Sequence, residues 1–226
     1  MTERRRSRTY RAVGYTTAPV LKTSWATGPV PLPSRERTAA LHSVPVHGVI
    51  FTSLRDFVAS AHGAEVVDEV FGKDVYLLSE AYEDEQLVAL LGRACEITGT
   101  ELDPLLHDFG VFTAERTFTR LYPAFFAIAP SAREFILTVE TRIHELVRAT
   151  IPKARPPELG VTELGDDGVS IVYSSPRRLC VLLRGLAEGT ARHYGETTSI
   201  DEETCMHRGD DACRFAVRFS PVTPTA

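Results

Sequence analysis

The sequence lacks any hydrophobic run long enough to cross a membrane, because no window reaches the roughly 18 uninterrupted apolar residues that a spanning helix needs. Its first residues also lack the apolar stretch of a secretory signal peptide. We therefore expect a cytoplasmic protein with no membrane partner. Basic charge is in short supply too, since 25 Lys and Arg stand against 30 Asp and Glu in 226 residues. The net charge of −5 argues against nucleic acid as the main partner, because phosphate binding needs a basic surface.

Cysteine is also scarce, with four in the chain. Without an export signal, so few cysteines favour reduced thiols or metal ligands over a disulfide framework. Cys205 and Cys213 bracket a tight turn and Cys180 lies upstream, so the three thiols can meet at one zinc ion, which prefers a tetrahedral set of ligands. The candidates for the remaining ligand are Glu202, His207 and His193. A reduced or redox-active thiol cluster is the alternative.

Internal repeats and glycine-rich phosphate loops are absent from the sequence, and its 43% of hydrophobic residues is typical of a soluble globular protein. Residues 1–45 differ from the rest, because they are rich in Arg, Ser, Thr and Pro and carry eight basic side chains against two acidic ones. We interpret these residues as a disordered basic arm. An alternative hypothesis places the true start of translation at Val46.

The remaining 181 residues carry a net charge of −11, because the arm contributes +6 to the total of −5. A domain of that size buries roughly 70% of the surface of its unfolded chain, which is enough to enclose a cofactor. We therefore place one folded domain at residues 46–220 and a short tail at residues 221–226.

Apolar residues recur every three to four positions from residue 47 onward, which predicts a series of helices. Gly99 is the expected stop of one helix, and Pro123 is the expected break in another. The clearest prediction is a single helix over 131–151, with Ser131 as its N-cap. The predicted helices span 47–58, 65–71, 83–98, 102–126 and 131–151.

The period changes after Pro156 and Pro157. Two short apolar segments flank a Gly-Asp-Asp-Gly turn, which predicts a hairpin of strands 160–164 and 169–173. A helix over 177–194 and strands over 197–206 and 213–219 are expected to follow. Helices first and antiparallel strands later predict an α+β fold.

His144 lies on an apolar stripe of the predicted helix over 131–151, together with Leu137, Val147 and Ile151. A histidine on such a stripe is expected to be buried, and its imidazole then needs a partner. One interpretation is a core histidine bonded to a carbonyl group. The other is a neutral axial ligand to haem iron in an apolar wall.

Tyr173, Ser175 and Arg177 alternate along an extended segment, so their side chains point the same way. Two hydroxyl groups and a guanidinium directed at one spot are suited to hold a pair of carboxylates. Ser175 and Pro176 also form a typical N-cap and first residue for the helix that follows. The cap explains those two residues and leaves Tyr173 and Arg177 to the carboxylate site.

Together these residues resemble the haem nitric oxide/oxygen-binding (H-NOX) family. The resemblance covers Val46 to Phe219 and rests on five motifs: His47–Ile50, Tyr122–Phe126, Glu140–His144, Pro156–Pro157 and Tyr173-x-Ser-x-Arg177. It implies a fold in which an N-terminal helical subdomain is followed by helices packed on an antiparallel sheet, with haem buried between the two.

The resemblance also implies roles for individual residues. His144 becomes the proximal ligand to the ferrous iron of haem b, and Tyr173, Ser175 and Arg177 bind the propionates. Pro157 presses on the porphyrin and distorts it, and Ile50 contacts it. In this family NO weakens or breaks the bond to the proximal histidine, which shifts the protein between two states. We therefore expect five-coordinate iron, with the histidine released, when NO is bound.

Family members that hold O₂ carry a distal tyrosine at the position of Leu182, and some carry an aromatic residue at the position of Leu54. A pocket lined by these two leucines and Phe112 implies a preference for NO, because bound O₂ needs a hydrogen-bond donor. Thr113 is the alternative, since it would turn a hydroxyl group into this pocket.

Bacterial relatives bind zinc through three cysteines and a histidine, which matches Cys180, Cys205 and Cys213 but places Glu202 where the family has histidine. The resemblance further implies a sensor without catalysis of its own, which signals in trans to a histidine kinase or a cyclic-di-GMP enzyme. The alternatives are a haem or zinc enzyme and a small-molecule or zinc/redox-sensing regulatory domain related to vinyl-reductase-type domains.

Overall fold

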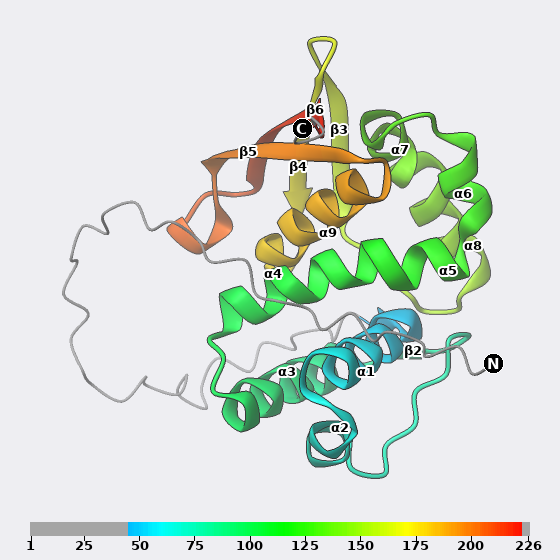
Figure 1. Ribbon diagram of the computed structural model, residues 1–226, viewed down its shortest axis with the longest axis vertical. Helices are drawn as coiled ribbons and strands as arrows, with labels where there is room; N and C mark the ends of the chain where they lie inside the picture. The colour runs from blue at the N-terminus through cyan, green and yellow to red at the C-terminus, as the bar shows by residue number, and fades with distance from the viewer. Residues whose placement is uncertain (1–44, 223–226) are drawn as a thin grey trace, which may run out of the picture. The chain divides into compact units, whose positions relative to one another are not determined.

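The computed structural model describes residues 45–222. Most of the arm predicted at 1–45 and the last four residues of the predicted tail at 221–226 lie outside these described residues. The described chain begins with β1 (Val46–His47), which pairs antiparallel with β2 (Ala81–Tyr82). The helical subdomain, as we call it, is completed by α1 (Gly48–His62), α2 (Ala64–Phe71) and α3 (Asp84–Thr98) (Figure 1).

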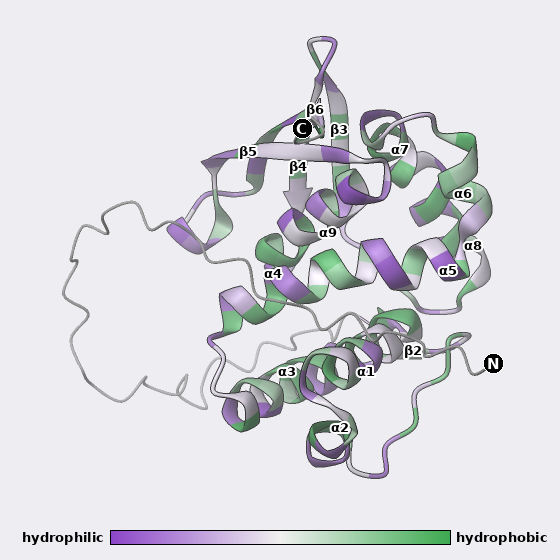
Figure 2. Cartoon of the chain, in the orientation of Figure 1, coloured by the Kyte–Doolittle hydropathy of each residue, from purple (hydrophilic) through white to green (hydrophobic). Residues whose placement is uncertain are grey.

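The three helices predicted first along the chain are confirmed, with ends that differ from the prediction by a few residues. Their apolar faces turn inward, and Phe51, Leu54 and Leu90 have no exposed surface. Figure 2 shows the alternation of hydrophobic and hydrophilic residues along these helices. Gly99 ends α3 in the left-handed conformation at a φ of 67°, where a side chain would be strained.

The run predicted as one helix over 102–126 is divided into four pieces. It comprises α4 (Leu102–Phe112), the π-helical segment η1 (Thr113–Phe118), α5 (Thr119–Leu121) and α6 (Pro123–Ile128). The break predicted near Pro123 is confirmed, because Tyr122 leaves the helical conformation and Pro123 begins α6. A proline is favoured at such a first position, where its missing N–H costs nothing.

The single helix predicted over 131–151 is wrong in its continuity. The structure has α7 (Ala132–Thr138), a π-helical segment η2 (Val139–His144) and α8 (Glu145–Thr150). The N-cap prediction is confirmed, since the Ser131 hydroxyl accepts a hydrogen bond from the Glu134 backbone N–H at 3.2 Å. A π turn is closed by i→i+5 hydrogen bonds, and an apolar period of three to four residues does not reveal it.

The second half of the chain builds a four-stranded antiparallel sheet in the order β3-β4-β6-β5. Its strands are β3 (Glu158–Leu164), β4 (Gly168–Ser174), β5 (Glu196–Thr204) and β6 (Cys213–Pro221), and the short helix η3 (Met206–Arg208) joins the last two. The predicted hairpin is confirmed, and its register places Leu164 opposite Gly168. The α+β class is therefore confirmed.

The helix α9 (Cys180–His193) begins three residues later than the predicted start at Arg177. Arg178 has a φ of 51°, in the left-handed region, so the helix cannot extend back through it. Leu179 is the N-cap residue, and the predicted cap at Ser175 is wrong. The Ser175 hydroxyl instead accepts a hydrogen bond from the Arg177 N–H at 3.3 Å, within the turn that precedes the helix.

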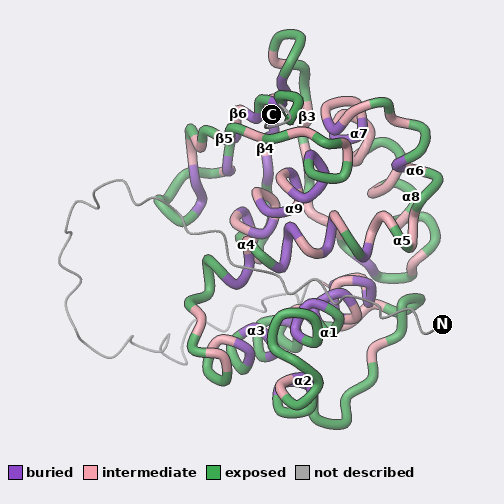
Figure 3. The backbone as a smooth tube through the Cα atoms, in the orientation of Figure 1, coloured by how far each residue is buried: buried purple, intermediate pink, exposed green. Residues whose placement is uncertain are grey.

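The helix α9 packs against the four-stranded sheet and also crosses α4 closely, so it connects the sheet to the helices that precede it in the chain (Figure 1). Gly110, Gly185 and Gly189 lie at this crossing, and most of the residues of α9 are shielded from solvent (Figure 3). A Cβ atom at Gly185 would stand 2.1 Å from the carbonyl oxygen of His107. The absence of side chains therefore permits the close approach.

Within residues 45–222, no helix is both long and apolar enough to cross a bilayer.

Candidate functional site

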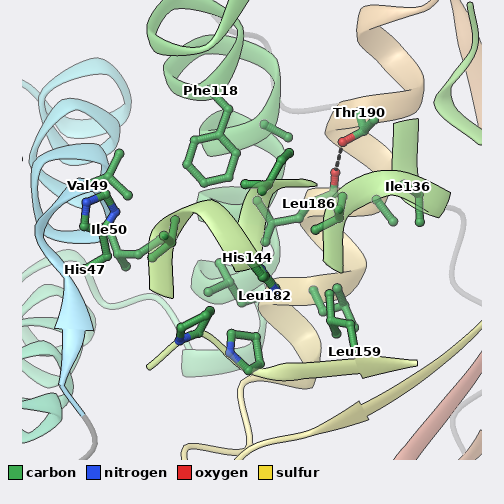
Figure 4. A pocket seen from close by; sticks show the side chains of 18 of the residues that line it. His47, Val49, Ile50, Phe118, Ile136, His144, Leu159, Leu182, Leu186 and Thr190 are labelled. Carbon is green, nitrogen blue, oxygen red and sulfur yellow. Dashed lines mark hydrogen bonds between the residues drawn. The ribbon is translucent and has the colours of Figure 1, made fainter. Parts of the chain in front are cut away.

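A cavity of about 250 Å³ lies between the helical subdomain and the four-stranded sheet. Nearly all of its wall is apolar. Figure 4 shows side chains that converge on it, with His47 and Ile50 on one side and Ile136 and Leu159 on the other. The polar side chains on the wall are few: His47, Tyr122, His144, Arg155, Tyr173, Arg177 and Thr190.

His144 is the last residue of η2, and its side chain is 15% exposed. Burial lowers the pKa of His144, against the opposing effect of Glu140, so the imidazole is neutral at pH 7. Its Nδ1 lies 2.8 Å from Oε2 of Glu140. The partner of this buried histidine is therefore a carboxylate and not a backbone carbonyl, and Nε2 is the nitrogen that can ligate a metal.

Glu140 also binds Arg148 through its other carboxylate oxygen. Burial alone would raise the pKa of Glu140, but the hydrogen bonds from Arg148 and His144 outweigh it and hold the pKa below its usual value. The carboxylate is therefore ionised at pH 7. The sequence motif contains Glu140, but nothing in the spacing assigned it a role, because four residues separate many unrelated pairs on helices.

Tyr173 and Arg177 both lie on the cavity wall, and Ser175 is buried beside them in the same segment. The Tyr173 hydroxyl accepts a hydrogen bond from the Leu179 N–H at 3.0 Å. Burial raises the pKa of Tyr173, so the hydroxyl keeps its proton and can donate it to an acceptor. Arg177 donates to the carbonyl oxygens of Pro45 at 3.1 Å and Arg155 at 3.0 Å. The structure thus brings the predicted carboxylate site together.

His47 is a wall residue to which the sequence assigned no role. Its Nε2 is buried and has no hydrogen-bond partner within the described residues. Burial lowers the pKa of His47, so its imidazole is neutral. A buried polar nitrogen without a partner is costly, and a polar group on a bound ligand would satisfy it. The sequence signal that could have identified His47 was its place in the His47–Ile50 motif.

Pro157, Ile50 and Leu182 lie on the cavity wall, where the sequence placed them. Two other predicted wall residues lie elsewhere. Leu54 is fully buried in the core of the helical subdomain, and the Phe112 ring packs 5.7 Å from that of Phe57.

The hydroxyl of Thr113 does not reach the cavity either. It lies 2.8 Å from the Ser53 hydroxyl, which in turn donates to Thr117 at 2.9 Å. All three residues are buried, and their hydroxyl groups satisfy one another. The alternative in which Thr113 lines the pocket is therefore not what the structure shows.

Cys180, Cys205 and Cys213 form a second, separate cluster of buried thiols. Their sulfur atoms all lie within 4.8 Å of one another, and Sγ of Cys205 is 3.9 Å from each of the other two. Tetrahedral zinc with Zn–S bonds of about 2.3 Å spaces its sulfur ligands about 3.8 Å apart. Burial, and then the neighbouring thiols, raises the pKa of Cys180 to about 12.

The three candidates for the remaining metal ligand are engaged elsewhere. The Glu202 carboxylate binds Arg208 at 2.8 Å. Burial raises the pKa of the Cys205 thiol, and a hydrogen bond with Glu202 raises it further. Nε2 of His207 lies 2.7 Å from the carbonyl oxygen of Arg178. The His193 ring packs against an aromatic ring 4.9 Å away. Of the three, Glu202 is the one that interacts with a thiol of the cluster, although its carboxylate is not among the ligand atoms that lie within 4.8 Å of one another.

The family model described as Haem-NO-binding matches residues 47–202. No curated protein matches the chain in sequence.

Among solved structures, an H-NOX protein from S. oneidensis in the Fe(II)NO ligation state shares 24% identity at a TM-score of 0.71, over 77% of this chain and 99% of that one. An Fe(II) unliganded H-NOX protein from K. algicida shares 24% identity at a TM-score of 0.69, over 80% and 100%. An H-NOX domain from Shewanella oneidensis in the Fe(II)CO ligation state shares 25% identity at a TM-score of 0.70, over 77% and 99%.

Proposed function

The chain belongs to the Haem-NO-binding (H-NOX) family of haem-based gas sensors, because the family model matches well over half of its length. From this premise we propose that the protein senses NO through a haem held by His144. Domains of this family are sensors rather than enzymes. The observation that carries the proposal is the neutral imidazole of His144, only 15% exposed, on the wall of an apolar cavity.

The residues of the cavity fit haem. Apolar walls suit the faces of a porphyrin, and Tyr173, Ser175 and Arg177 supply two hydroxyl groups and a guanidinium for its propionates. The unpartnered Nε2 of His47 is a further polar atom that a bound group would satisfy. In this proposal Pro157 presses on the porphyrin, and haem b supplies a ferrous centre that binds diatomic gases.

The preference for NO over O₂ is supported by the apolar side chains of Ile50 and Leu182 on the wall. Bound O₂ is polarised and gains from a hydrogen-bond donor, which neither side chain offers, whereas NO bonds strongly to ferrous iron without one. The Thr190 hydroxyl is already engaged, because it donates to the Leu186 carbonyl oxygen at 2.8 Å (Figure 4).

The signal starts at His144 in this proposal. This residue lies at the junction of η2 and α8, so its release from the iron when NO binds frees that junction to move. Such release is a shift between two states that bind the ligand with different affinities. The output passes in trans to a histidine kinase or a cyclic-di-GMP enzyme, partner types that H-NOX membership favours.

The test is the absorption spectrum of the purified protein under argon, in air and with NO. The ferrous protein should keep its argon spectrum in air and change with NO to the spectrum of five-coordinate iron. His144→Ala should lose the Soret band, while His62→Ala, at an exposed histidine, should keep it. Retained six-coordination with NO would contradict the release of His144. A stable O₂ complex would contradict the selectivity and would point to the hydroxyl of the wall residue Tyr122.

We also propose structural zinc at Cys180, Cys205 and Cys213, with Glu202 as the oxygen ligand. The spacing of the sulfur atoms supports it. Metal analysis should find close to one zinc per chain, and Cys213→Ser should lose it while Cys95→Ser, outside the cluster, should not. A metal-free protein whose three thiols oxidise reversibly would favour the redox-sensing alternative instead.

A further inference from the structure

The carboxylate of Glu140 connects two side chains on one face of the segment that carries His144. Its Oε2 lies 2.8 Å from Nδ1 of His144, and its Oε1 accepts a hydrogen bond from Arg148. The side chains of Glu140 and His144 are only 26% and 15% exposed. Water therefore competes weakly for this hydrogen bond, which makes it stronger than a surface contact.

The direction of the hydrogen bond decides its chemical effect. An ionised carboxylate only accepts, so the neutral imidazole carries its proton on Nδ1 and donates it to Glu140, which leaves the lone pair on Nε2. A metal-binding histidine that donates its other N–H to a carboxylate is fixed in orientation and becomes a more basic ligand. Hydrogen bonding behind the axial ligand is one of the means by which a protein adjusts haem iron.

We propose that Glu140 is a positioning residue that strengthens the bond of His144 to haem iron and thereby sets how much of the protein releases His144 when NO binds. This inference rests on the proposed function, because it takes His144 as the iron ligand. Electron donation from the carboxylate through the imidazole favours ferric over ferrous iron and opposes release. Glu140 thus sets the threshold of the response to NO.

A purely structural role for Glu140 is the competing explanation. Glutamate and histidine four residues apart on a helix surface stabilise the helix weakly and need have no further consequence. Here the histidine faces a cavity and is largely buried, and Arg148, which is 36% exposed, holds the carboxylate from its solvent side. The test therefore needs measurements that a structural role would leave unchanged.

The experiment compares Glu140→Gln with Glu145→Gln, which removes the same charge from an exposed residue next to His144. In the full chain loaded with haem, Glu140→Gln should lower the iron–histidine stretching frequency of the ferrous protein and raise the fraction of NO-bound protein that has released His144. The ferrous form should gain about tenfold over the ferric form, a rise in midpoint potential of about 59 mV for one electron. Glu145→Gln should leave all three measurements unchanged.

Glu140→Asp provides an independent variant, because it keeps the charge but withdraws the carboxylate by one methylene group. It should shift the three measurements in the same direction as Glu140→Gln. If both variants match the wild type in frequency, ligation and potential, this proposal is overturned while the proposed function stands. A wild-type protein that takes up no haem, or a His144→Ala variant that keeps its Soret band, would overturn the proposed function and this proposal with it.

Discussion

In the proposed function, Leu182 is the residue on which the choice of gas depends most directly. It lies on the cavity wall at a position where O₂-binding relatives, by the resemblance described above, carry a tyrosine. Leu182→Tyr should therefore give a ferrous O₂ complex that persists in air, because the new hydroxyl donates a hydrogen bond to the polarised ligand. Absorption spectra and O₂ dissociation rates measure the change. Leu182→Phe, which adds the ring without the hydroxyl, should form no such complex, and a similar gain in both variants would refute the explanation.

At the same scale, residue chemistry predicted much of the candidate site. His144, Tyr173 and Arg177 lie on the cavity wall as their alternation and apolar surroundings suggested, although their roles stay predictions. Leu54 does not lie on the wall, because an apolar side chain on an amphipathic helix suits a core as well as a cavity. Glu140 belongs to one of the sequence motifs, but the sequence assigned it no role, because its contact with His144 depends on the rotation of the helix.

Among the elements, the crossing of α4 and α9 depends on glycine. A Cβ atom at Gly185 would overlap the backbone oxygen of His107 at 2.1 Å, whereas one at Gly92 in α3 would meet nothing within 4 Å. Gly185→Ala should lower the free energy of unfolding by about 3 kcal/mol through overpacking. Gly92→Ala should raise it by about 0.5–1 kcal/mol, because alanine loses less backbone entropy in a helix. Chemical denaturation of both variants measures the difference. Equal effects would show that α4 and α9 can move apart without loss of stability.

The same two helices share an ion pair that makes stability depend on pH. Nε2 of His107 in α4 lies 3.1 Å from Glu188 in α9, and this hydrogen bond raises the pKa of His107 above its usual 6.5. It also lowers the pKa of Glu188 below its usual 4.5. The pair therefore stabilises the fold fully between about pH 4.5 and 6.5, and its contribution is lost as pH rises through the raised pKa of His107.

We accordingly expect the contribution of this pair to the free energy of unfolding to fall between pH 6 and pH 8, by at most about 1 kcal/mol because both side chains are partly exposed. His107→Gln should flatten that part of the pH profile, as denaturation at a series of pH values would show. His62→Gln, at an exposed histidine of α1, should leave the slope as it is. If the slope persists in His107→Gln, other titratable groups cause it.

The segment 131–151 is helical, as predicted, but a π-helical turn interrupts the single α-helix that the sequence indicated. Its N-cap at Ser131 is local chemistry, since one hydroxyl satisfies one backbone N–H within three residues. The π-helical turn of η2 is not local, because it depends on how the segment packs against the sheet and the cavity. That turn ends at His144, the proposed ligand to haem iron. Such turns are frequent at functional sites.

At the scale of the whole molecule, the described residues that line the cavity run from Val46 to Thr190. Pro45 itself is needed, because its carbonyl oxygen accepts hydrogen bonds from the Arg155 backbone and from the Arg177 side chain. A variant that begins at Ser43 should therefore keep the haem content, the NO spectrum and the unfolding temperature of the full chain. Loss of haem from this variant would show that residues 1–42 take part in the site. Mass spectrometry of the native protein would test the hypothesis of a start at Val46.

By itself the sequence determined the α+β class, the order of helices and strands, the hairpin, and the buried histidine with its nearby tyrosine and arginine. These features follow from periodicity, caps and turns, which act over a few residues along the chain. The tertiary structure alone decided that His144 faces Glu140, that Thr113 turns to Ser53, and that Leu54 and Phe112 pack into the core of the helical subdomain. Each of these contacts depends on how packed elements are rotated and spaced, and no local pattern along the chain records that.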